Sequence, residues 1–335
     1  MPLLLVAAAL AVQPELTRPG PLLDGDGQLV ETGWARAPIK AYDRAQVPGR
    51  AKEWDNFNVW TADHSLAVTV ADVGRIGLVS VTWRDLATGE LVTEREWIPF
   101  PRLALPPTPG QGHVRHDGDR IDVAITHHPP DRRRLQVTTP TLTADVWLVR
   151  DAHDDSIVLA HPWAEGPEYF TYSVKQLPLD PVGTVRRGPV TLTLTPETAF
   201  GVMDWGRSVR PREGTWLWGF GAQGDVGWNL GGGGPADQGW TQNVVVVDGV
   251  AHAFGPVTFT WEDPDGPWRV VSDDGALDLV LTPRLSHREA RDLRVAATDI
   301  TQAFGSWSGT IALDNGRVLT ITDAPGLAEQ VYNRW

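Results

Sequence analysis

The stretch from Met203 to Gly219 holds the greatest concentration of side chains that could perform chemistry. It contains two carboxylates, three arginines and three tryptophans. Trp216 and Trp218 are two residues apart, so on a strand they share a face. We expect Asp204 and Arg207 in a glycine-containing loop before that strand, where the guanidinium would hold the pKa of the carboxyl low. This favours an electrostatic or orienting role for Asp204, although such ion pairs are often purely structural.

A glycine-rich segment at residues 227–234 is the second candidate. No Lys-Ser or Lys-Thr follows the glycines, which argues against a phosphate-binding loop. The segment is better interpreted as a strand connection in which glycine permits close backbone approach. Asn229 and Asn243 could orient a ligand in an apolar cavity, with Trp228 as a wall, or could simply bond to loop backbone.

The third candidate is the stretch from Glu53 to Trp60, where aromatic residues alternate with Asp and Asn. Trp54 and Asp55 in this pattern are typical of a cavity mouth or a sugar-binding surface. The alternative is a strand whose tryptophans face the core.

Metal and serine-hydrolase chemistry have little support. The histidines at positions 113, 116, 127 and 128 do not match a strong zinc-ligand spacing, and no Gly-x-Ser-x-Gly motif is present. We therefore expect no metal and no cofactor.

The composition limits the class of function. The 335 residues include 42 acidic and 29 basic side chains, and the net charge of −13 argues against a nucleic-acid partner. The chain has no cysteine, which excludes a thiolate nucleophile. Its 16 tryptophans exceed the 4 tyrosines and 8 phenylalanines. Because a buried indole N–H needs a partner, this indicates either an aromatic-lined cavity or a tryptophan-dependent core.

The elements that must position these residues are predicted to be strands. Alternation of apolar and polar residues predicts strands at 64–70, 77–83, 91–97, 139–148 and 190–194. Asp-Gly and Asn-Gly pairs at 248–249, 274–275 and 315–316 predict hairpins. Only Pro325 to Tyr332 resembles a short helix.

We therefore predict an all-β protein with two lipocalin-like antiparallel barrel or sandwich lobes and few short helices. The segment Pro181 to Gly188 is interpreted as a connecting loop. The predicted domains are an apolar extension at 1–14, an N-terminal lobe at 15–185 and a C-terminal lobe at 186–335.

The apolar run Leu3 to Val12 is too short to span a bilayer. It lacks the positive start of a signal peptide, so we expect a cytoplasmic protein, with export as the alternative. No other run is long enough to be transmembrane.

Nearly the whole chain after Pro14 resembles a bacterial family known as the domain of unknown function numbered 2804. The residues that carry the resemblance include Gly33-Trp-Ala-Arg36, Glu53-Trp-Asp55, Ile98-Pro-Phe-Pro101, Pro196 to Arg207, Trp228-Asn229, Gln302-Ala-Phe-Gly305, Ser308-Gly-Thr310 and Gly326 to Trp335. After Asp-Trp-Gly-Arg the family pattern continues with glycine and aromatic residues. Ser208, Arg210 and Arg212 stand there instead. If the family's aromatic residues line a ligand cavity, the mouth is more cationic here, which implies either a more polar or acidic ligand or a site that has lost its usual role.

The architecture also resembles, more distantly, the two-lobed lipocalin-like proteins of the carotenoid hydratase (hydroxyneurosporene synthase) group and fungal pericyclases. That resemblance, an analogy of fold, implies a cavity for a hydrophobic or amphipathic small molecule.

Three hypotheses follow. The first is a hydratase, isomerase, cyclase or carrier of a hydrophobic small molecule. Its cavity is lined by Trp205, Trp216, Trp218 and Trp228, with Asp204 or Glu197 as acid and Arg207 and Asn229 orienting the ligand. The second is a carbohydrate-active protein that pairs two of Asp55, Glu197 and Asp204. The third is a non-catalytic structural or partner-binding β protein. The sequence leaves the ligand and the oligomeric state open.

Overall fold

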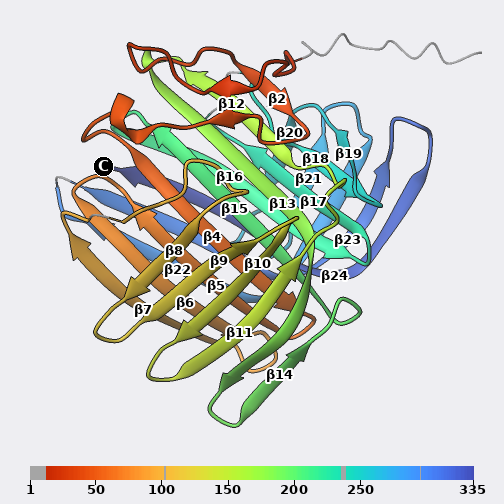
Figure 1. The fold of residues 1–335 in the computed structure, drawn as a ribbon. Coiled ribbons are helices and arrows are strands. Elements are labelled where there is room, and N and C mark those ends of the chain that lie inside the picture. The colour runs from red at the N-terminus through yellow and green to blue at the C-terminus, as the bar shows by residue number, and fades with distance from the viewer. Residues whose placement is uncertain (1–12, 102, 235–238, 295) are drawn as a thin grey trace, which may run out of the picture.

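The computed structural model describes residues 13–101, 103–234, 239–294 and 296–335. Within them the regular secondary structure is almost entirely β-strand, as Figure 1 shows. The helical structure in this part of the chain is the short 3₁₀-helix η1 (Arg44–Gln46). The predicted all-β class is therefore confirmed. The apolar run at 3–12 lies outside the described residues.

The larger sheet contains most strands of the first two thirds of the chain. Its main path runs in the order β7-β6-β5-β4-β15-β13-β11-β10-β9-β8, while β12 and β14 pair with β13, and β2 pairs with β12. Its strands are β2 (Gly33–Ala35), β4 (Lys52–Thr61), β5 (His64–Asp72), β6 (Ile76–Asp85), β7 (Glu90–Pro99), β8 (His113–Asp117), β9 (Asp122–His128), β10 (Arg132–Thr138), β11 (Leu142–Val149), β12 (Ile157–Trp163), β13 (Gly166–Arg187), β14 (Val190–Leu194) and β15 (Ala199–Val209). A small parallel pair, β1 (Gly20–Pro21) and β3 (Lys40–Ala41), lies outside this sheet.

The second sheet contains the remaining strands in the order β19-β18-β17-β16-β24-β23-β22-β21-β20. These are β16 (Glu213–Gln223), β17 (Val226–Gly232), β18 (Val244–Val247), β19 (Val250–Ala253), β20 (Val257–Thr260), β21 (Trp268–Ser272), β22 (Leu277–Asp292), β23 (Ala297–Ala312) and β24 (Val318–Arg334). The predicted hairpin turns at 248–249, 274–275 and 315–316 connect β18 to β19, β21 to β22 and β23 to β24.

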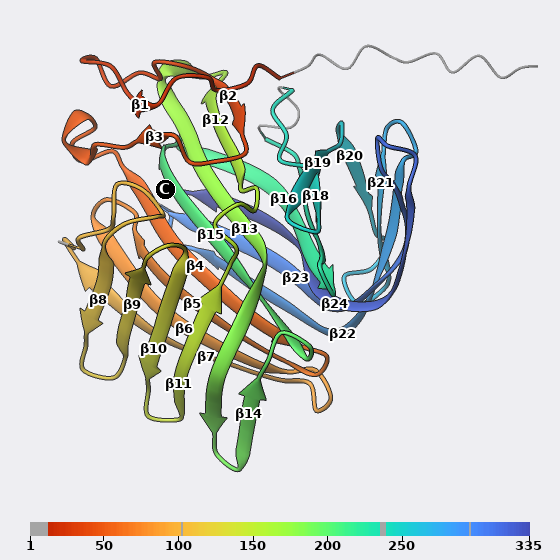
Figure 2. The same ribbon diagram turned by 45° about the vertical axis from the view of Figure 1, so that its right-hand side comes forward.

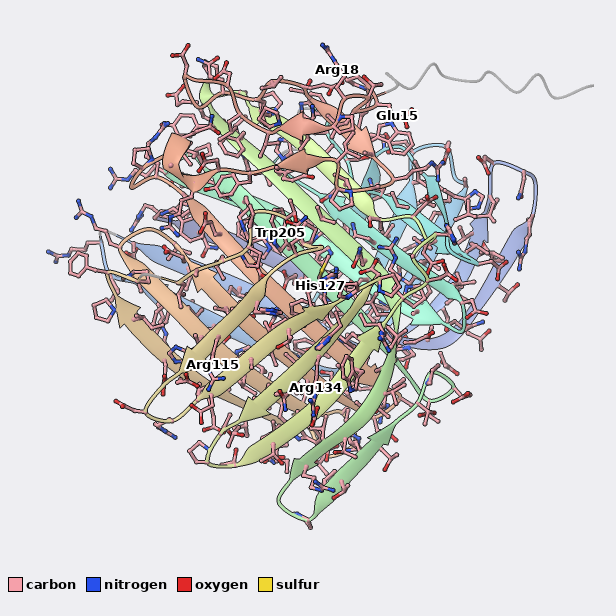
Figure 3. The ribbon with its side chains drawn as sticks, in the orientation of Figure 1. Glu15, Arg18, Arg115, His127, Arg134 and Trp205 are labelled. Carbon is pink, nitrogen blue, oxygen red and sulfur yellow. The ribbon has the colours of Figure 1, made fainter. Side chains whose placement is uncertain are left out.

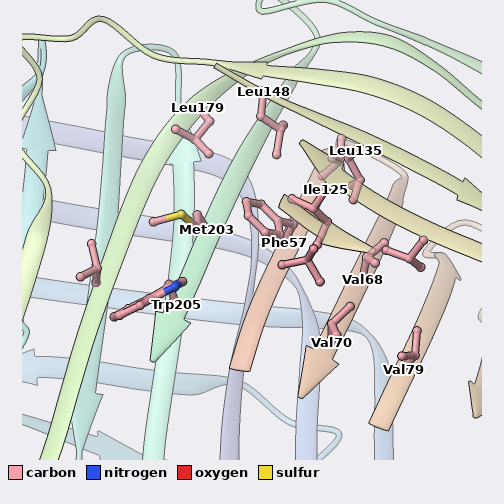
Figure 4. Close-up of a cluster of buried hydrophobic side chains, with 14 of the residues drawn as sticks. Phe57, Val68, Val70, Val79, Ile125, Leu135, Leu148, Leu179, Met203 and Trp205 are labelled. Carbon is pink, nitrogen blue, oxygen red and sulfur yellow. The ribbon is translucent and has the colours of Figure 1, made fainter. Parts of the chain in front are cut away.

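Each sheet curls over its own apolar core, giving two lobes. In the first lobe, strands β8–β11 lie over β4–β7 (Figures 1 and 2). Figure 4 shows the side chains between these layers, among them Phe57, Val68, Ile125, Leu135 and Met203. The outer surface of β8–β11 carries charged side chains such as Arg115 and Arg134 (Figure 3). The second lobe has a separate core of buried aliphatic residues and tryptophans.

A third apolar cluster joins the two lobes. Trp60 from β4 is fully buried and packs against Phe220 and Phe304 of the second sheet, with ring centroids 5.8 and 6.2 Å away. It also stacks on Phe200 of β15 at 6.4 Å. Because aromatic rings bury a large apolar area, this cluster holds the lobes in a fixed relation on one side of their interface.

The segment Pro325 to Tyr332, predicted to be a helix, is strand, and that prediction was wrong. It lies inside β24, which pairs with β16 on one side and β23 on the other. Residues 327–329 are buried in succession, so the segment lacks the alternation of a strand with one exposed face. A strand buried on both faces cannot be distinguished from a short buried helix by periodicity alone.

Residues 181–187 are the end of β13 and not a loop, which corrects a second prediction. The first sheet continues through β15, and the chain enters the second sheet between Val209 and Glu213. The division into domains at residues 15–185 and 186–335 stays a prediction.

We predict that Gly326→Ala destabilises the fold by about 2 kcal/mol, the range typical of overpacked cores. A Cβ at residue 326 would lie 2.1 Å from the carbonyl oxygen of Phe220 and 2.7 Å from the indole nitrogen of Trp307. Urea unfolding followed by fluorescence measures the change in free energy. Gly214→Ala on β16 is the control, because its Cβ would meet only Trp163 at 4.0 Å. Equal effects of the two substitutions would contradict the prediction.

Candidate functional site

A cavity of about 470 Å³ lies between the two lobes, on the faces of the sheets opposite their cores. Strands β4–β7, β12, β13 and β15 supply the wall from the first lobe, and β16, β17 and β22–β24 supply the wall from the second. Its volume suits a small organic molecule. The tryptophans that line it are Trp54, Trp163, Trp216, Trp218, Trp240 and Trp335.

The strand period of two determines which residues reach the cavity. On β4, Asn56 and Asn58 line the cavity, while Phe57 and Val59 lie in the first-lobe core. On β15, Asp204 lines the cavity, while its neighbours Met203 and Trp205 lie in that core. The strands at the centre of the first sheet are therefore covered on both faces: one face packs in the core of the first lobe, and the other lines the cavity.

A buried ion pair stands at the centre of the cavity wall. Lys175 on β13 and Asp204 on β15 are register partners, and Lys175 Nζ lies 2.7 Å from Asp204 Oδ1. The same Nζ lies 4.3 Å from the ring centroid of Trp218 on the second lobe. The lysine therefore serves both the ion pair and a cation–π contact across the cavity.

A chain of hydrogen bonds fixes Trp218. Its indole N–H donates to Asn229 Oδ1 at 2.7 Å, and Asn229 Nδ2 donates to the carbonyl oxygen of Gln242 at 2.7 Å. Ser173 on the first lobe donates to Gln242 Oε1 at 2.8 Å. These bonds hold the indole in one orientation beneath Lys175.

Glu329 is the carboxylic acid best suited to hold a proton in the cavity. It lies on β24 opposite both Trp218 and Gln302, and Gln302 Nε2 donates to its Oε2 at 2.7 Å. Burial raises the pKa of Glu329 above its ordinary value of 4.5, against the hydrogen bond from Gln302, which lowers it; the negative charge of Asp204 raises it, and the positive charges of Lys175 and Arg84 lower it. A carboxyl with a raised pKa is the usual form of a general acid.

His161 is the corresponding neutral base. Burial lowers its pKa to about 4, so the imidazole is uncharged at neutral pH. Its Nδ1 lies 2.8 Å from the carbonyl oxygen of Pro162, which can only accept a hydrogen bond. The proton is therefore on Nδ1, and Nε2 carries a free lone pair on a residue that lines the cavity.

Several residues predicted from the sequence line this cavity together. These are Trp54, Asp204, Trp216, Trp218 and Asn229. They come from both lobes, and Asp204 and Trp218 meet through Lys175.

Asp55, Trp205 and Arg207 lie on the opposite face, in the core of the first lobe. Arg207 is fully buried and donates to Asp55 Oδ1 at 2.8 Å and to the carbonyl oxygens of Trp54, Gly206 and Pro106. The predicted Asp204–Arg207 pair in a loop was wrong. Both residues lie on β15, three positions apart, so their side chains point to opposite faces.

The other predicted residues do not line the cavity. Trp228 lies in the second-lobe core, 6.5 Å from the ring centroid of Trp307. Asn243 accepts from the Gly231 N–H at 2.7 Å and donates to the Gly255 carbonyl oxygen at 2.9 Å. Glu197 is exposed in the turn before β15. The carboxylates of residues 55, 197 and 204 thus lie in three separate places and do not form a pair.

Sequence reasoning missed Lys175, Glu329, His161 and Arg84, which also line the cavity. Lys175, His161 and Arg84 belong to none of the motifs described above, and Glu329 lies in the stretch Gly326 to Trp335, which was not interpreted as part of the site. They meet because distant strands pair, and no local pattern in the sequence shows that pairing.

No metal cluster is evident in the described part of the chain: no three His, Asp or Glu side chains are arranged to hold an ion. His116 is one of the histidines considered for zinc. Its Nε2 lies instead 2.6 Å from Glu96 Oε2, within hydrogen-bond distance. Among the same residues, no helix is long and apolar enough to cross a membrane.

Comparisons with known proteins identify similar folds. The model of the family described as Domain of unknown function (DUF2804) matches residues 13–335, and no curated protein matches the sequence. The crystal structure of a candidate AttH from Nitrosomonas europaea has a TM-score of 0.54 and 14% identity, over 84% of this chain and 92% of that one. Kievitone hydratase from Nectria haematococca has a TM-score of 0.49 and 11% identity, over 96% and 97% of the two chains. The first of these likenesses shows a shared fold and nothing about activity.

We predict that Asp55→Ala lowers the free energy of unfolding by about 3 kcal/mol, because it leaves the guanidinium of Arg207 buried without a counter-charge. The exposed pair Arg269–Asp278 offers the control, since Asp278→Ala should cost less than about 1 kcal/mol. Urea unfolding of both variants measures the difference. Similar losses would show that Asp55 and Arg207 are no more coupled than a surface pair.

We predict that Glu329→Gln stabilises the protein above pH 4.5. In the unfolded chain the carboxyl ionises near pH 4.5, whereas in the folded protein it ionises at higher pH. The folded state therefore binds more protons in this window, and wild-type stability falls as the pH rises through it. Each unit of the shift is worth about 1.4 kcal/mol. The melting temperatures of the wild type and of Glu329→Gln, measured from pH 4 to 8, should diverge as the pH rises. Parallel curves for the two proteins would contradict a raised pKa of Glu329.

Proposed function

The chain belongs to the DUF2804 family, and we propose that it binds an amphipathic small molecule between its lobes and catalyses a proton transfer on it, as in a hydration or isomerisation. The observation that carries the proposal is the buried carboxyl of Glu329. It faces an interlobe cavity beside the Lys175–Asp204 pair, where burial keeps it protonated to higher pH.

The proposed chemistry begins with protonation by Glu329. Transfer of its proton to a substrate double bond forms a C–H bond and leaves positive charge on the adjacent carbon. The indole faces of Trp216 and Trp218 can stabilise that charge. Water then adds through its oxygen, and the proton it releases returns to the carboxylate of Glu329. In an isomerisation, the proton would instead be lost from a neighbouring carbon.

Asp204 has a supporting role in this proposal. Its carboxylate is held by Lys175, so it is better suited to stabilise charge than to deliver a proton. It also favours the protonated form of Glu329 through repulsion. The sequence-based preference for an electrostatic role of Asp204 is therefore retained in the proposal.

The tryptophan content supports a ligand cavity alongside a structural core. Trp60, Trp205, Trp228, Trp268 and Trp307 are fully buried. Six others line the cavity. A purely structural protein needs the buried tryptophans of the core, but it gains little stability from tryptophans that line a cavity.

The first experiment is native mass spectrometry of the purified protein, with analysis of an organic extract. We expect a retained small molecule of amphipathic character. An empty protein that binds no aromatic probe by calorimetry would contradict the cavity proposal and favour a structural role.

The second experiment tests catalysis. Extracted compounds are incubated with the protein in D₂O, and we expect deuterium incorporation or addition of water. Glu329→Gln should reduce that rate by about 100-fold or more, the usual contribution of a general acid, while leaving ligand binding in place. Glu262→Gln, at an exposed site, is the control. Binding without any exchange would identify a carrier and overturn the catalytic part of the proposal.

A further inference from the structure

Arg210 lines the cavity and forms no ion pair with any residue in the described part of the chain. It lies in the link between β15 and β16, where the chain passes from one lobe to the other. Its guanidinium carbon is 4.8 Å from the ring centroid of Trp54 on the first lobe and 4.8 Å from that of Trp216 on the second. The guanidinium thus makes a cation–π contact with a tryptophan from each lobe.

The hydrogen-bonding capacity of Arg210 is unused. It forms no hydrogen bond or ion pair with any described residue, and its Nε is buried without a partner. The nearby carboxylate of Asp204 is bonded to Lys175 instead. Arg207, three residues earlier, has four oxygen acceptors within 2.9 Å. Stacking occupies the faces of a guanidinium and leaves its in-plane N–H groups free.

The charge of Arg210 persists in this setting. Burial lowers its pKa to about 10, against the opposing effect of the negative charge of Asp204, so the group is a cation at neutral pH. A buried cation without a counter-ion is unfavourable, and a ligand anion would relieve that cost. The unused donors form a planar fork, which matches the two oxygens of a carboxylate.

We propose that Arg210 anchors the carboxylate of the ligand, and that the substrate class of this cavity is a small organic acid with an apolar or aromatic body. This rests on the proposed function, because it takes the cavity as the ligand site. Trp54 and Trp216 hold the guanidinium in place, and the same tryptophans with Trp163 and Trp240 offer surfaces to the body of the ligand.

Arg84 is a weaker candidate for the anchor. It lines the same cavity with its guanidinium carbon 4.3 Å from the ring centroid of Phe304. However, it donates a hydrogen bond to Ser65 at 3.3 Å, and the charge of Glu329 acts on it. The charge of Asp204 acts on Arg210 in the same way, but Arg210 forms no hydrogen bond with any residue that the structure describes.

The test compares two probes of nearly the same shape, 2-naphthoic acid and 2-naphthamide, by isothermal titration calorimetry at fixed ionic strength. The wild-type protein should bind the acid about 10- to 100-fold more tightly than the amide, as expected for charge-assisted hydrogen bonds. Arg210→Met should bring that ratio close to one and leave amide binding nearly unchanged. Arg210→Lys, which keeps the charge but loses the fork, should retain only part of the preference.

Arg212→Met is the matched control, because Arg212 is exposed in the same link and should leave the preference intact. Equal binding of acid and amide by the wild type, or an unchanged ratio in Arg210→Met, would overturn the anchor while the cavity proposal stands. Displacement of the acid by inorganic phosphate at similar concentration would overturn the assignment to a carboxylate. If neither probe binds the wild type, the proposed function itself fails.

Discussion

Cations of the first lobe and of the link between the lobes, each in contact with an aromatic ring of the second lobe, set the geometry of the cavity. Lys175 lies over Trp218, Arg84 lies over Phe304, and Arg210 lies between Trp54 and Trp216. Such contacts contribute about 0.5 to 2 kcal/mol each, depending on how far they are desolvated. They bring the lobes together and leave space between them. An apolar cluster such as the one around Trp60 would instead fill that space.

The same cavity depends on strands that are buried on both faces. On β15, residue 204 points to the cavity, whereas Trp205 and Arg207 point to the first-lobe core. An ion pair between Arg207 and Asp55 is thus a structural feature of the core, and the pair of Lys175 and Asp204 belongs to the cavity. A single motif of four residues therefore divides its chemistry between two environments, because neighbouring side chains on a strand face opposite ways.

The sequence predicted what local patterns control. Alternation and Asp-Gly or Asn-Gly turns identified the strands and hairpins, and the aromatic spacing placed Trp216 and Trp218 on one face. It could not predict Glu329, because the pairing of β24 with β16 and β23 brings that residue to the cavity. For the same reason, the doubly buried β24 lacked a strand pattern and was mistaken for a helix. Asp204 and Arg207 do not pair as predicted, because residues three positions apart on a strand point to opposite faces.

The spacing of residues along β16 determines how far the carboxylate anchor Arg210 lies from the proton donor Glu329. Trp216, which supports Arg210, and Trp218, which supports Lys175, are two residues apart, so their positions differ by about 7 Å along the strand. Glu329 is the register partner of Trp218. If Arg210 holds the carboxylate of a ligand, the carbon next to that carboxylate is too far from Glu329 to react with it. The ligand atom that lies beside Glu329 and the Lys175–Asp204 pair is then several bonds away from the carboxylate. This separation favours an acid whose reactive double bond is remote from its carboxylate, so that the anchor and the proton donor act on opposite ends of one molecule.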